Sequence, residues 1–397
     1  MKILVNDYAG HPFQIDLSRN LAQIGHTVLH TYCSSVQTPR GRIESREDDS
    51  ANFYIKPISL RKKITKGAFF ERRKLEIEYG ANLNKEIENF TPDILIISNT
   101  PIDSQILIWK TCKEKGIVII YWLQDIQSIA IKKIIGSKIP ILGSLIAQYY
   151  KNQEKRQLKE SNHIISISEG FIPTLLNWGI ERNKISYIPN WAPIDEISVL
   201  NKNNDWAIKH QLADKKVVLY SGTLGFKHNP DLIKKLAVQL REDVSSMVVV
   251  ISEGIGQDFL QKQKELLNLD NLLLLPFQNF NLMSQVLASA DVLIGVLEKD
   301  AGIFSVPSKI LTYMCSNRPI VLSAPISNLS SEIIETSKAG LVIDPDSDDQ
   351  FVSEVVSLLN DQNRRDKFGD NGRWFAESNF KPINFIAKFE RIIKLPL

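Results

Sequence analysis

Residues 216–240 read KVVLYSGTLGFKHNPDLIKKLAVQL, and this stretch contains the pattern from which the whole chain is built. A continuous apolar run, 217–221, leads into a loop with two glycines and then into a helix-length segment, 231–240. Continuous apolar runs are typical of parallel strands that are covered on both faces. The stretch therefore predicts a strand, a loop and a helix of a parallel α/β sheet.

The same alternation recurs along the 397 residues. Further strands are predicted at 2–5, 27–32, 94–98, 118–121, 163–168, 247–252, 272–276, 292–296, 320–322 and 340–343, and further helices at 16–21, 259–267, 281–289, 308–315 and, as one amphipathic helix, 374–395. Two successive sets of strands and helices predict an α/β protein with two doubly wound, Rossmann-like domains. Two prolines in the segment IPNWAP, 188–193, end the first set, so the predicted domains are 1–193 and 194–374.

Composition excludes several classes of protein. Hydrophobic residues make up 43% and charged residues 23%, which is ordinary for a globular chain and excludes disorder, collagen and coiled coil. The chain has no run of 18 apolar residues, and its start, MKILVNDYAG, resembles a buried strand more than a secretory signal. The widely spaced Cys33, Cys112 and Cys315 form no CxxC, which predicts neither disulfides nor zinc and favours the cytoplasm.

The net charge of +3 is unevenly distributed. Residues 1–195 hold 26 Lys and Arg against 20 Asp and Glu, whereas 196–397 hold 22 against 25. Most of the excess lies in 56–74 and in 132–159, where basic residues alternate with isoleucine and leucine. Such a surface predicts attachment to anionic lipid at the inner face of a membrane, and a solvated helical face is the alternative. Nucleic acid is not expected, because these stretches carry no aromatic stacking pattern.

Three places in the second half have the chemistry of an anion site. The loop 220–227 combines Gly222 with Lys227, the loop 252–256 holds two glycines, and 302–309 ends in Ser308 and Lys309 before a helix. Glycine lets backbone N–H groups approach a phosphate, and lysine adds a positive charge. We expect Ser308 to cap the helix, and a lysine in a first helical turn calls for a reason such as a bound anion. A structural turn with surface lysines is the alternative for each place.

The order of these elements resembles the donor half of GT-B glycosyltransferases of family 4. The matching segments are the YSG loop with its lysine, EGIG (253–256), LLPF (274–277), SVPSK (305–309) and NRPIVLS (317–323). The first half agrees, with WLQD at 122–125, ISISEG at 165–170 and IPNW at 188–191. Among such enzymes the chain is most similar to the bacterial colanic-acid and O-antigen branch, which includes N-acetyl-fucosamine-type transferases.

The resemblance implies a donor site for a nucleotide-diphosphate sugar in the second domain, with no cofactor and no metal. Lysines and backbone N–H groups would neutralise the departing diphosphate. The residues implied are the catalytic Lys227 and Lys309 and the donor-binding Gly222, Thr223, Gly254, Gly256, Phe277, Ser305, Pro307, Ser308 and Thr312. Gly254 and Gly256 would allow close backbone approach, and Phe277 would flank the base.

The resemblance also implies an acceptor site in the first domain, a retained anomeric configuration and no defined protein nucleophile. Asp125 would orient the acceptor hydroxyl or take its proton, while helix capping is its alternative role. Gly10 and His11 follow the first strand, where an acceptor would approach. The final segment, 375–397, would cross back to pack on the first domain.

Two departures from the family pattern concern the donor site. Phe304 and Thr312 stand where two glutamates eight positions apart are usual, and Thr223 stands where an arginine is frequent. We interpret them as variation within the branch. The acidic run Asp344, Asp346, Asp348 and Asp349 precedes a helix and is interpreted as its acidic N-terminus, not as a metal site. The six histidines have no metal-ligand spacing.

Together, the resemblance and the basic first half predict a retaining, metal-independent hexosyltransferase at the inner face of the plasma membrane. It would transfer a sugar to a lipid-linked saccharide in the biosynthesis of O-antigen, capsule or exopolysaccharide. Two alternatives stay open at this point. One is a nucleotide-sugar 2-epimerase of the same fold, and the other is a non-catalytic nucleotide-sugar-binding subunit.

Overall fold

The computed structural model describes residues 1–396 except 63–68, 99, 137–139, 226–227 and 302–307. These residues form two compact units, each with its own sheet. Unit 1 contains 1–190 and 382–396, and unit 2 contains 191–301 and 308–381. The predicted α/β class with two Rossmann-like domains is confirmed.

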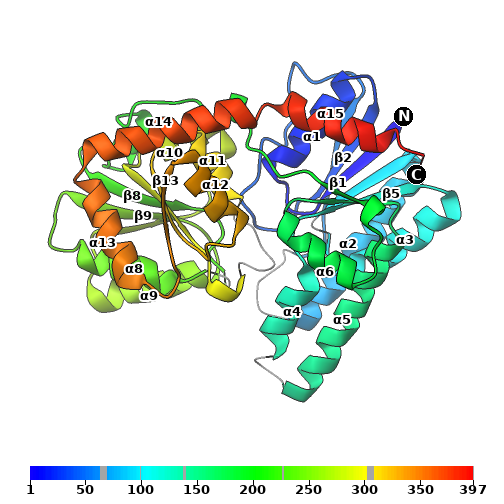
Figure 1. Cartoon of the computed structure of the whole chain (residues 1–397), viewed down its shortest axis with the longest axis horizontal. Coiled ribbons are helices and arrows are strands. Elements are labelled where there is room, and N and C mark those ends of the chain that lie inside the picture. Colours follow the sequence, from blue (N-terminus) through cyan, green and yellow to red (C-terminus); the bar gives the residue numbers. More distant parts are fainter. Residues whose placement is uncertain (63–68, 99, 137–139, 226–227, 302–307, 397) are drawn as a thin grey trace. The chain divides into compact units, whose positions relative to one another are not determined.

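Unit 1 is built on a parallel sheet in the order β3-β2-β1-β4-β5-β6-β7. Its strands are β1 (Lys2–Asp7), β2 (Thr27–Cys33), β3 (Phe53–Ile58), β4 (Ile94–Ser98), β5 (Val118–Leu123), β6 (His163–Ser166) and β7 (Ile185–Tyr187). Its helices are α1 (Pro12–Gln23), α2 (Phe69–Phe90), α3 (Ile102–Lys115), α4 (Gln127–Gly136), α5 (Pro140–Glu160), α6 (Ile172–Asn177) and α15 (Pro382–Ile393). Figure 1 shows α1 and α15 on one face of the sheet and α2, α3 and α5 on the other.

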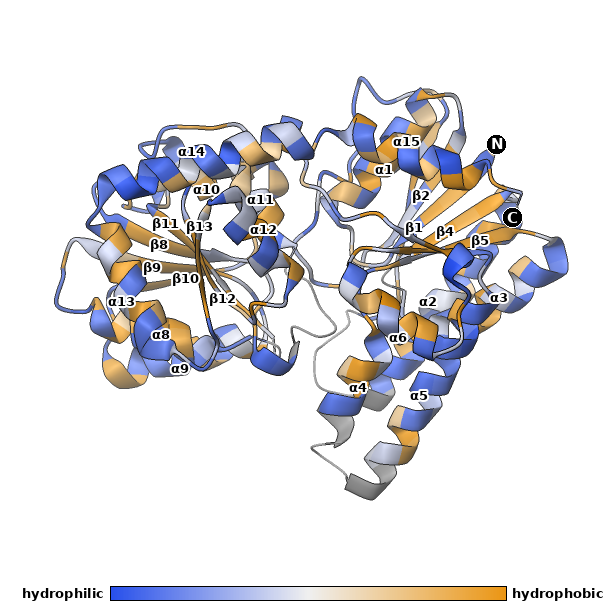
Figure 2. Cartoon of the chain, in the orientation of Figure 1, coloured by the Kyte–Doolittle hydropathy of each residue, from blue (hydrophilic) through white to orange (hydrophobic). Residues whose placement is uncertain are grey.

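Unit 2 has a six-stranded parallel sheet in the order β10-β9-β8-β11-β12-β13. Its strands are β8 (Lys216–Ser221), β9 (Ser246–Ile251), β10 (Leu272–Leu275), β11 (Val292–Val296), β12 (Ile320–Ser323) and β13 (Gly340–Ile343). Its helices are α7 (Asp205–Lys209), α8 (Pro230–Gln239), α9 (Ile255–Leu267), α10 (Met283–Ala288), α11 (Lys309–Met314), α12 (Leu329–Ser337), α13 (Asp348–Leu359) and α14 (Gln362–Asn379). Figure 2 shows the strands of both units as the most hydrophobic segments, between helices with one polar face.

The strand order places the expected ligand sites. In an open parallel sheet, ligands bind beyond the carboxyl ends of the strands, where neighbouring connections run in opposite directions. That reversal lies between β1 and β4 in unit 1 and between β8 and β11 in unit 2. The loops after β1 and β8 carry the glycines that the sequence singles out, and α11 with Lys309 follows β11.

The single helix predicted over 374–395 is wrong. The chain forms two helices there, since α14 ends at Asn379 and α15 begins at Pro382. Proline lacks the N–H that a helix interior needs, and it disfavours the helical conformation of the preceding residue. Both effects favour a helix start at Pro382. α15 packs against α1 in unit 1, and its Phe389 ring lies 4.8 Å from that of Trp122 on β5.

Two global properties complete the fold. Within the described part of the chain, no helix is long and apolar enough to cross a membrane. Cys33, Cys112 and Cys315 are each buried and form no disulfide. Burial raises the pKa of all three thiols, so these side chains behave as small apolar groups.

Candidate functional site: a lysine at the end of β8 and an acidic loop after β5

The donor-side site of unit 2 begins where β8 ends. Gly222 has φ +139°, a conformation that L side chains rarely adopt, and its N–H donates to the carbonyl of Ile251 at 2.9 Å. A Cβ atom at this position would lie 2.9 Å from Cε of Lys309 and 3.1 Å from its Nζ. The missing side chain of Gly222 therefore leaves the space that the lysine occupies.

Lys309 is the first residue of α11, and its side chain extends to the end of β8. Its ammonium group donates a hydrogen bond to the hydroxyl of Tyr220 and lies 3.7 Å from the centroid of that ring. A cation over an aromatic face is attracted by the ring quadrupole. The lysine charge is thus held beside the backbone of the β8 loop, and its role toward a phosphate stays a prediction.

Two buried tyrosines organise this loop. The hydroxyl of Tyr220 donates to the carbonyl of Thr223 at 2.7 Å. Tyr313, four residues after Lys309 on α11, accepts from the N–H of Ser221 at 2.8 Å and donates to its carbonyl at 2.9 Å. Burial raises the pKa of both tyrosines, so both hydroxyls stay protonated at neutral pH. They connect α11 to the end of β8.

The glycines of the second loop have different roles. Gly254 has φ +95° and stands directly before α9, where it shapes the turn from β9 into the helix. The N–H of Gly256 donates to the carbonyl of Leu224 at 3.1 Å, and a Cβ on Gly256 would lie only 2.4 Å from that oxygen. Gly256 therefore allows α9 to approach the β8 loop closely, which is a packing role within the protein.

The other predicted donor residues fall into two groups. Phe277 follows β10 and its N–H faces the carboxylate of Glu253 at 3.4 Å, while Thr312 is half-buried on α11. Ser308 stands at the N-cap of α11 but its side chain makes no capping hydrogen bond, so the expected cap is wrong; its backbone there is helical, not extended as at a usual N-cap. Lys227, Ser305 and Pro307, and also Phe304, lie outside the described residues.

On unit 1, the loop after β1 is held by a buried aspartate. The carboxylate of Asp7 accepts from the N–H groups of Ala9 and His11, and His11 Nδ1 lies 3.4 Å from it. Gly10 has φ +82°, and a Cβ there would lie 3.2 Å from Cγ of Arg40. The ring of His11 stacks on Phe13 at 5.4 Å. Gly10 and His11 thus lie at the carboxyl edge of the sheet, where we expect the acceptor.

Asp125 lies in the short connection between β5 and α4, with fixed residues on both sides. Before it, Gln124 pairs with Asn190 through two side-chain hydrogen bonds of 2.6 and 3.3 Å. After it, the N–H groups of Gln127 and Ser128 donate to the carboxylate of Glu154 at 2.8 and 2.9 Å. The side chain of Asp125 is half-buried at the carboxyl edge of the sheet.

The residues that the sequence excluded from metal binding have other partners. Asp346 pairs with Lys299, Asp348 pairs with Lys235 at 2.7 Å, and Asp348 and Asp349 occupy the first turn of α13. This confirms the acidic N-terminus. His228 accepts from the N–H of Gly225 at 3.0 Å and closes the β8 loop. Within the described segments no three His, Cys, Asp or Glu side chains group as metal ligands.

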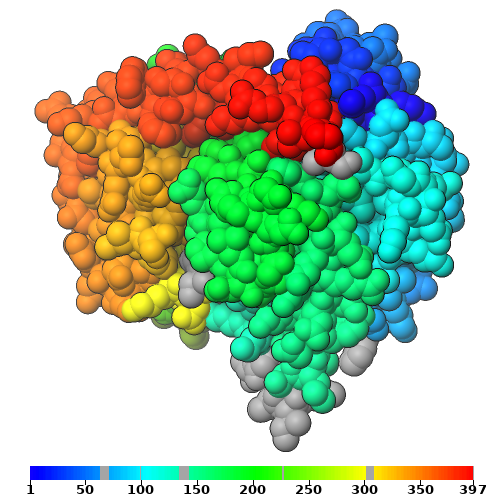
Figure 3. Space-filling view, turned by 45° about the vertical axis from the view of Figure 1, so that its right-hand side comes forward, coloured from blue at the N-terminus to red at the C-terminus, as the bar shows by residue number. Residues whose placement is uncertain are grey.

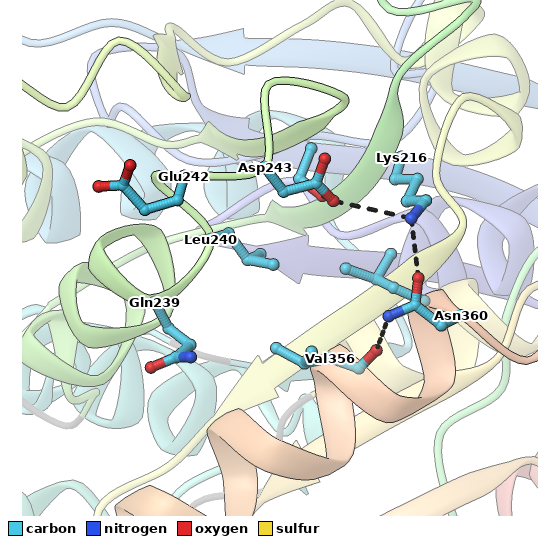
Figure 4. A pocket seen from close by; sticks show the side chains of 9 residues that line it. Lys216, Gln239, Leu240, Glu242, Asp243, Val356 and Asn360 are labelled. Atoms are coloured by element: carbon cyan, nitrogen blue, oxygen red, sulfur yellow. Dashed lines mark hydrogen bonds and ion pairs between the residues drawn. The ribbon is translucent and has the colours of Figure 1, made fainter.

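A pocket of about 350 Å³ lies at the amino end of β8, away from the carboxyl ends of the strands (Figure 4). The Lys216 ammonium lies in its lining, 3.6 Å from the Asp243 carboxylate and 2.7 Å from Oδ1 of Asn360. Lys216 is thus paired with Asp243 and hydrogen-bonded to Asn360. None of the predicted site residues lines this pocket.

Three contributors to the site are not predicted from the sequence. Tyr220 lies in the loop motif without a predicted role, and Tyr313 and Glu154 belong to no predicted motif. One signal was available for Tyr313, since a residue four positions after Lys309 shares its helix face. The contact of Tyr220 with Lys309, 89 residues away, has no local signal.

Two family models match the chain. Residues 14–196 match the model described as Glycosyltransferase Family 4, and residues 202–375 match the one described as Glycosyl transferases group 1. The boundary between the two matches falls just after the change of unit at residues 190 and 191.

Two curated relatives are similar at 22% identity. One is described as a colanic acid biosynthesis glycosyl transferase, WcaI, of Escherichia coli K12, matched over 251 residues, 62% of this chain and 60% of the relative. The other is an uncharacterized glycosyltransferase of Methanocaldococcus jannaschii, matched over 249 residues, 62% of each chain. The chain thus spans about three fifths of the relatives it matches.

Solved structures share the fold over nearly the full length. Sucrose-phosphate synthase from Thermosynechococcus elongatus superposes with a TM-score of 0.73 at 13% identity, over 99% of this chain and 98% of that one. WaaG, a glycosyltransferase involved in lipopolysaccharide biosynthesis, gives 0.72 at 15% identity, over 99% of each chain. Anabaena HepE in complex with UDP-glucose gives 0.70 at 13% identity, again over 99% of each.

Proposed function

Because the chain belongs to the glycosyl transferases of group 1 and family 4, which share the GT-B fold, we propose that it is a retaining hexosyltransferase. It moves a sugar from a nucleotide-diphosphate sugar to a lipid-linked saccharide in the biosynthesis of O-antigen, capsule or exopolysaccharide. The observation that carries the proposal is the Lys309 ammonium, which is held against the backbone of Gly222 at the end of β8.

The donor half of the proposed reaction depends on stabilising the negative charge of the departing diphosphate. The bond from the anomeric carbon to the diphosphate breaks, and negative charge grows on the leaving oxygen. The Lys309 ammonium is set in place before this charge appears, which lowers the barrier without reorganisation at the moment of reaction. No metal is required in this scheme. The donor class agrees with the UDP-glucose that the structural neighbour HepE binds.

The acceptor half is assigned to unit 1. A hydroxyl of the acceptor saccharide forms the new bond to the anomeric carbon on the face from which the diphosphate leaves. Asp125 accepts the hydrogen bond of that hydroxyl and orients it or takes its proton. Gly10 and His11 contact the acceptor from the neighbouring loop.

A panel of UDP, GDP, dTDP and their hexose conjugates tests the donor assignment by thermal shift. A ligand at 100 times its dissociation constant adds about 2.7 kcal/mol to the free energy of unfolding. We expect one nucleotide family to raise the melting temperature, equally with and without EDTA. The Lys309→Ala variant should lose most of this shift.

Four results would contradict the scheme. A shift that EDTA abolishes contradicts metal independence, and no shift with any nucleotide contradicts the donor site. Donor binding without transfer to any lipid-linked acceptor would favour a non-catalytic subunit, whereas conversion of the donor alone would favour an epimerase.

We place the membrane contact on α4 and α5. These two helices pack as a hairpin, and exposed apolar residues follow one another on α5, with Leu145 66% and Tyr149 40% exposed. Lys132 on α4 and Lys151 on α5 are exposed as well, and Figure 3 shows α5 at the surface of unit 1, in blue-green. Exposed apolar side chains and lysines on the same hairpin suit an anionic lipid surface.

Sedimentation with phosphatidylglycerol vesicles tests this contact. We expect the chain to bind these vesicles, to release them at high salt and to ignore phosphatidylcholine. Replacing Leu145 and Tyr149 together with serine should weaken binding roughly tenfold, because two apolar groups no longer enter the lipid. The control is Leu266→Ser, a leucine that is 73% exposed on α9 of unit 2. Equal loss in both variants would contradict the assignment.

A further inference from the structure

Glu154 is a fully buried carboxyl group to which the family motifs give no role. It lies on α5 with an exposed fraction of 0%, and its two oxygens accept from the N–H groups of Gln127 and Ser128, at the start of α4. Ionised groups are costly to bury unless they are hydrogen-bonded or paired. The two hydrogen bonds therefore indicate what the carboxylate is there to hold.

The start of α4 needs such an acceptor from elsewhere. The first N–H groups of a helix have no partner within the helix, and they are usually capped by a polar side chain directly before it. The residue before α4 is Ile126, whose side chain accepts no hydrogen bond. Glu154 supplies the acceptor from a neighbouring helix, and the Gln127 side chain adds a hydrogen bond to the carbonyl of Thr100 at 2.9 Å.

Asp125 lies two residues before this capped turn and one residue after Gln124, which is tied to Asn190. We propose that Glu154 is a positioning residue, which fixes the start of α4 and thereby the place of the acceptor-side carboxylate of Asp125. This inference rests on the proposed function, in which Asp125 meets the acceptor hydroxyl. A displacement of about 1 Å in a reacting group lowers rates by up to about 100-fold.

The raised pKa of Glu154 lets its positioning role be tested by varying the pH. The pKa of Glu154 is raised to about 7, mainly by burial; the donors on Ser128 and Gln127 oppose this shift, and the nearby charge of Asp125 adds to it. Tyr121 on β5 is another titratable group that interacts with it. Below this pKa the group gains a proton and loses the charge that strengthens both hydrogen bonds.

The same pKa predicts how stability depends on pH. Between the ordinary value of 4.5 and about 7, the folded chain holds a proton that the unfolded chain has released. Stability therefore falls as pH rises across this window. The ionised form is the less stable one, yet it is the form that holds α4 most firmly.

Three variants test the proposal in the full chain. Glu154→Gln keeps the shape but offers only one acceptor oxygen, and Glu154→Asp keeps the charge on a shorter side chain. Glu160→Gln is the control, because Glu160 lies on the same helix and pairs with Arg156 in solvent. The probes are amide hydrogen exchange of 124–130 and transfer from the hexose donor found in the thermal-shift panel to a polyprenyl-diphosphate-linked N-acetylhexosamine.

We expect Glu154→Gln to lower kcat about 10- to 100-fold, with the donor KM unchanged. The exchange of the Gln127 and Ser128 amides should become about tenfold faster at pH 8. The wild-type kcat should fall as pH drops through about 7, and Glu154→Gln should lack this decline. Glu154→Asp should regain part of the rate, and Glu160→Gln should match the wild type.

Faster amide exchange in Glu154→Gln with an unchanged kcat and pH profile would overturn the proposal, since Glu154 would then be only structural. A wild-type chain that binds donor but transfers to no lipid-linked acceptor would instead sink the proposed function, and with it any role in that reaction. Transfer by the wild type and equal transfer by the variant would sink the positioning role alone.

Discussion

Replacing Lys309 with alanine should lower kcat about 100- to 1000-fold, the loss usual for removing one preorganised group that stabilises developing negative charge. The free energy of unfolding should change little, because the lysine is half-buried at the start of a short helix and its removal leaves no large cavity. Steady-state transfer assays and calorimetric binding of the nucleoside diphosphate would measure the two effects.

The structure supplies matched variants for this prediction. Lys262→Ala removes an exposed lysine from α9 of the same unit and should leave turnover unchanged. Gly222→Ala keeps Lys309 but places a methyl group 2.9 Å from its Cε, on a residue with φ +139°. It should therefore reproduce most of the loss. Wild-type turnover in Lys309→Ala, with the fold intact, would contradict the donor site.

Gly340→Ala should lower the free energy of unfolding more than an alanine at any other described glycine of unit 2. A Cβ on Gly340 would lie 1.7 Å from the carbonyl oxygen of Ile320, its partner residue on the neighbouring strand. Backbone atoms at this distance have to separate, which disrupts the pairing of β12 with β13. We expect a loss of about 3 kcal/mol or more in the free energy of unfolding.

Urea unfolding followed by circular dichroism measures this loss, with the transitions of the two units fitted separately. The control is Gly225→Ala in the same unit, where a Cβ would meet no atom within 4 Å and φ is not positive. It should change the midpoint little. A midpoint for Gly340→Ala that equals the control would show that the edge strand adapts freely.

The strands that could be predicted are those with continuous apolar runs. The runs at 94–98 and 292–296 match β4 and β11, which are buried throughout, and the run at 340–343 matches the half-buried edge strand β13. β3 was missed because its sequence, FYIKPI, is interrupted by a lysine and a proline, and a proline in a strand is typical of an edge strand. β7 was missed because three residues carry too little pattern.

The site was predictable only as far as its motifs are local. Lys309, Gly222 and Asp125 were singled out from short segments. Gly222 and Lys309 follow β8 and β11, between which the strand order reverses, and Asp125 follows β5 at the carboxyl edge of the other sheet. The contacts that define their surroundings are long-range. Gln124 meets Asn190 and Glu154 meets Gln127 only after the chain has folded, and Gly256 serves packing against Leu224.

The place of α15 has a consequence for synthesis on the ribosome. Residues 382–393 complete the core of unit 1, yet they are translated after the whole of unit 2. Domains generally fold as units in the order in which they emerge. Here unit 2 has its full complement of strands and helices first, and the nascent unit 1 waits, with one face of its sheet uncovered beside α1, until α15 leaves the exit tunnel.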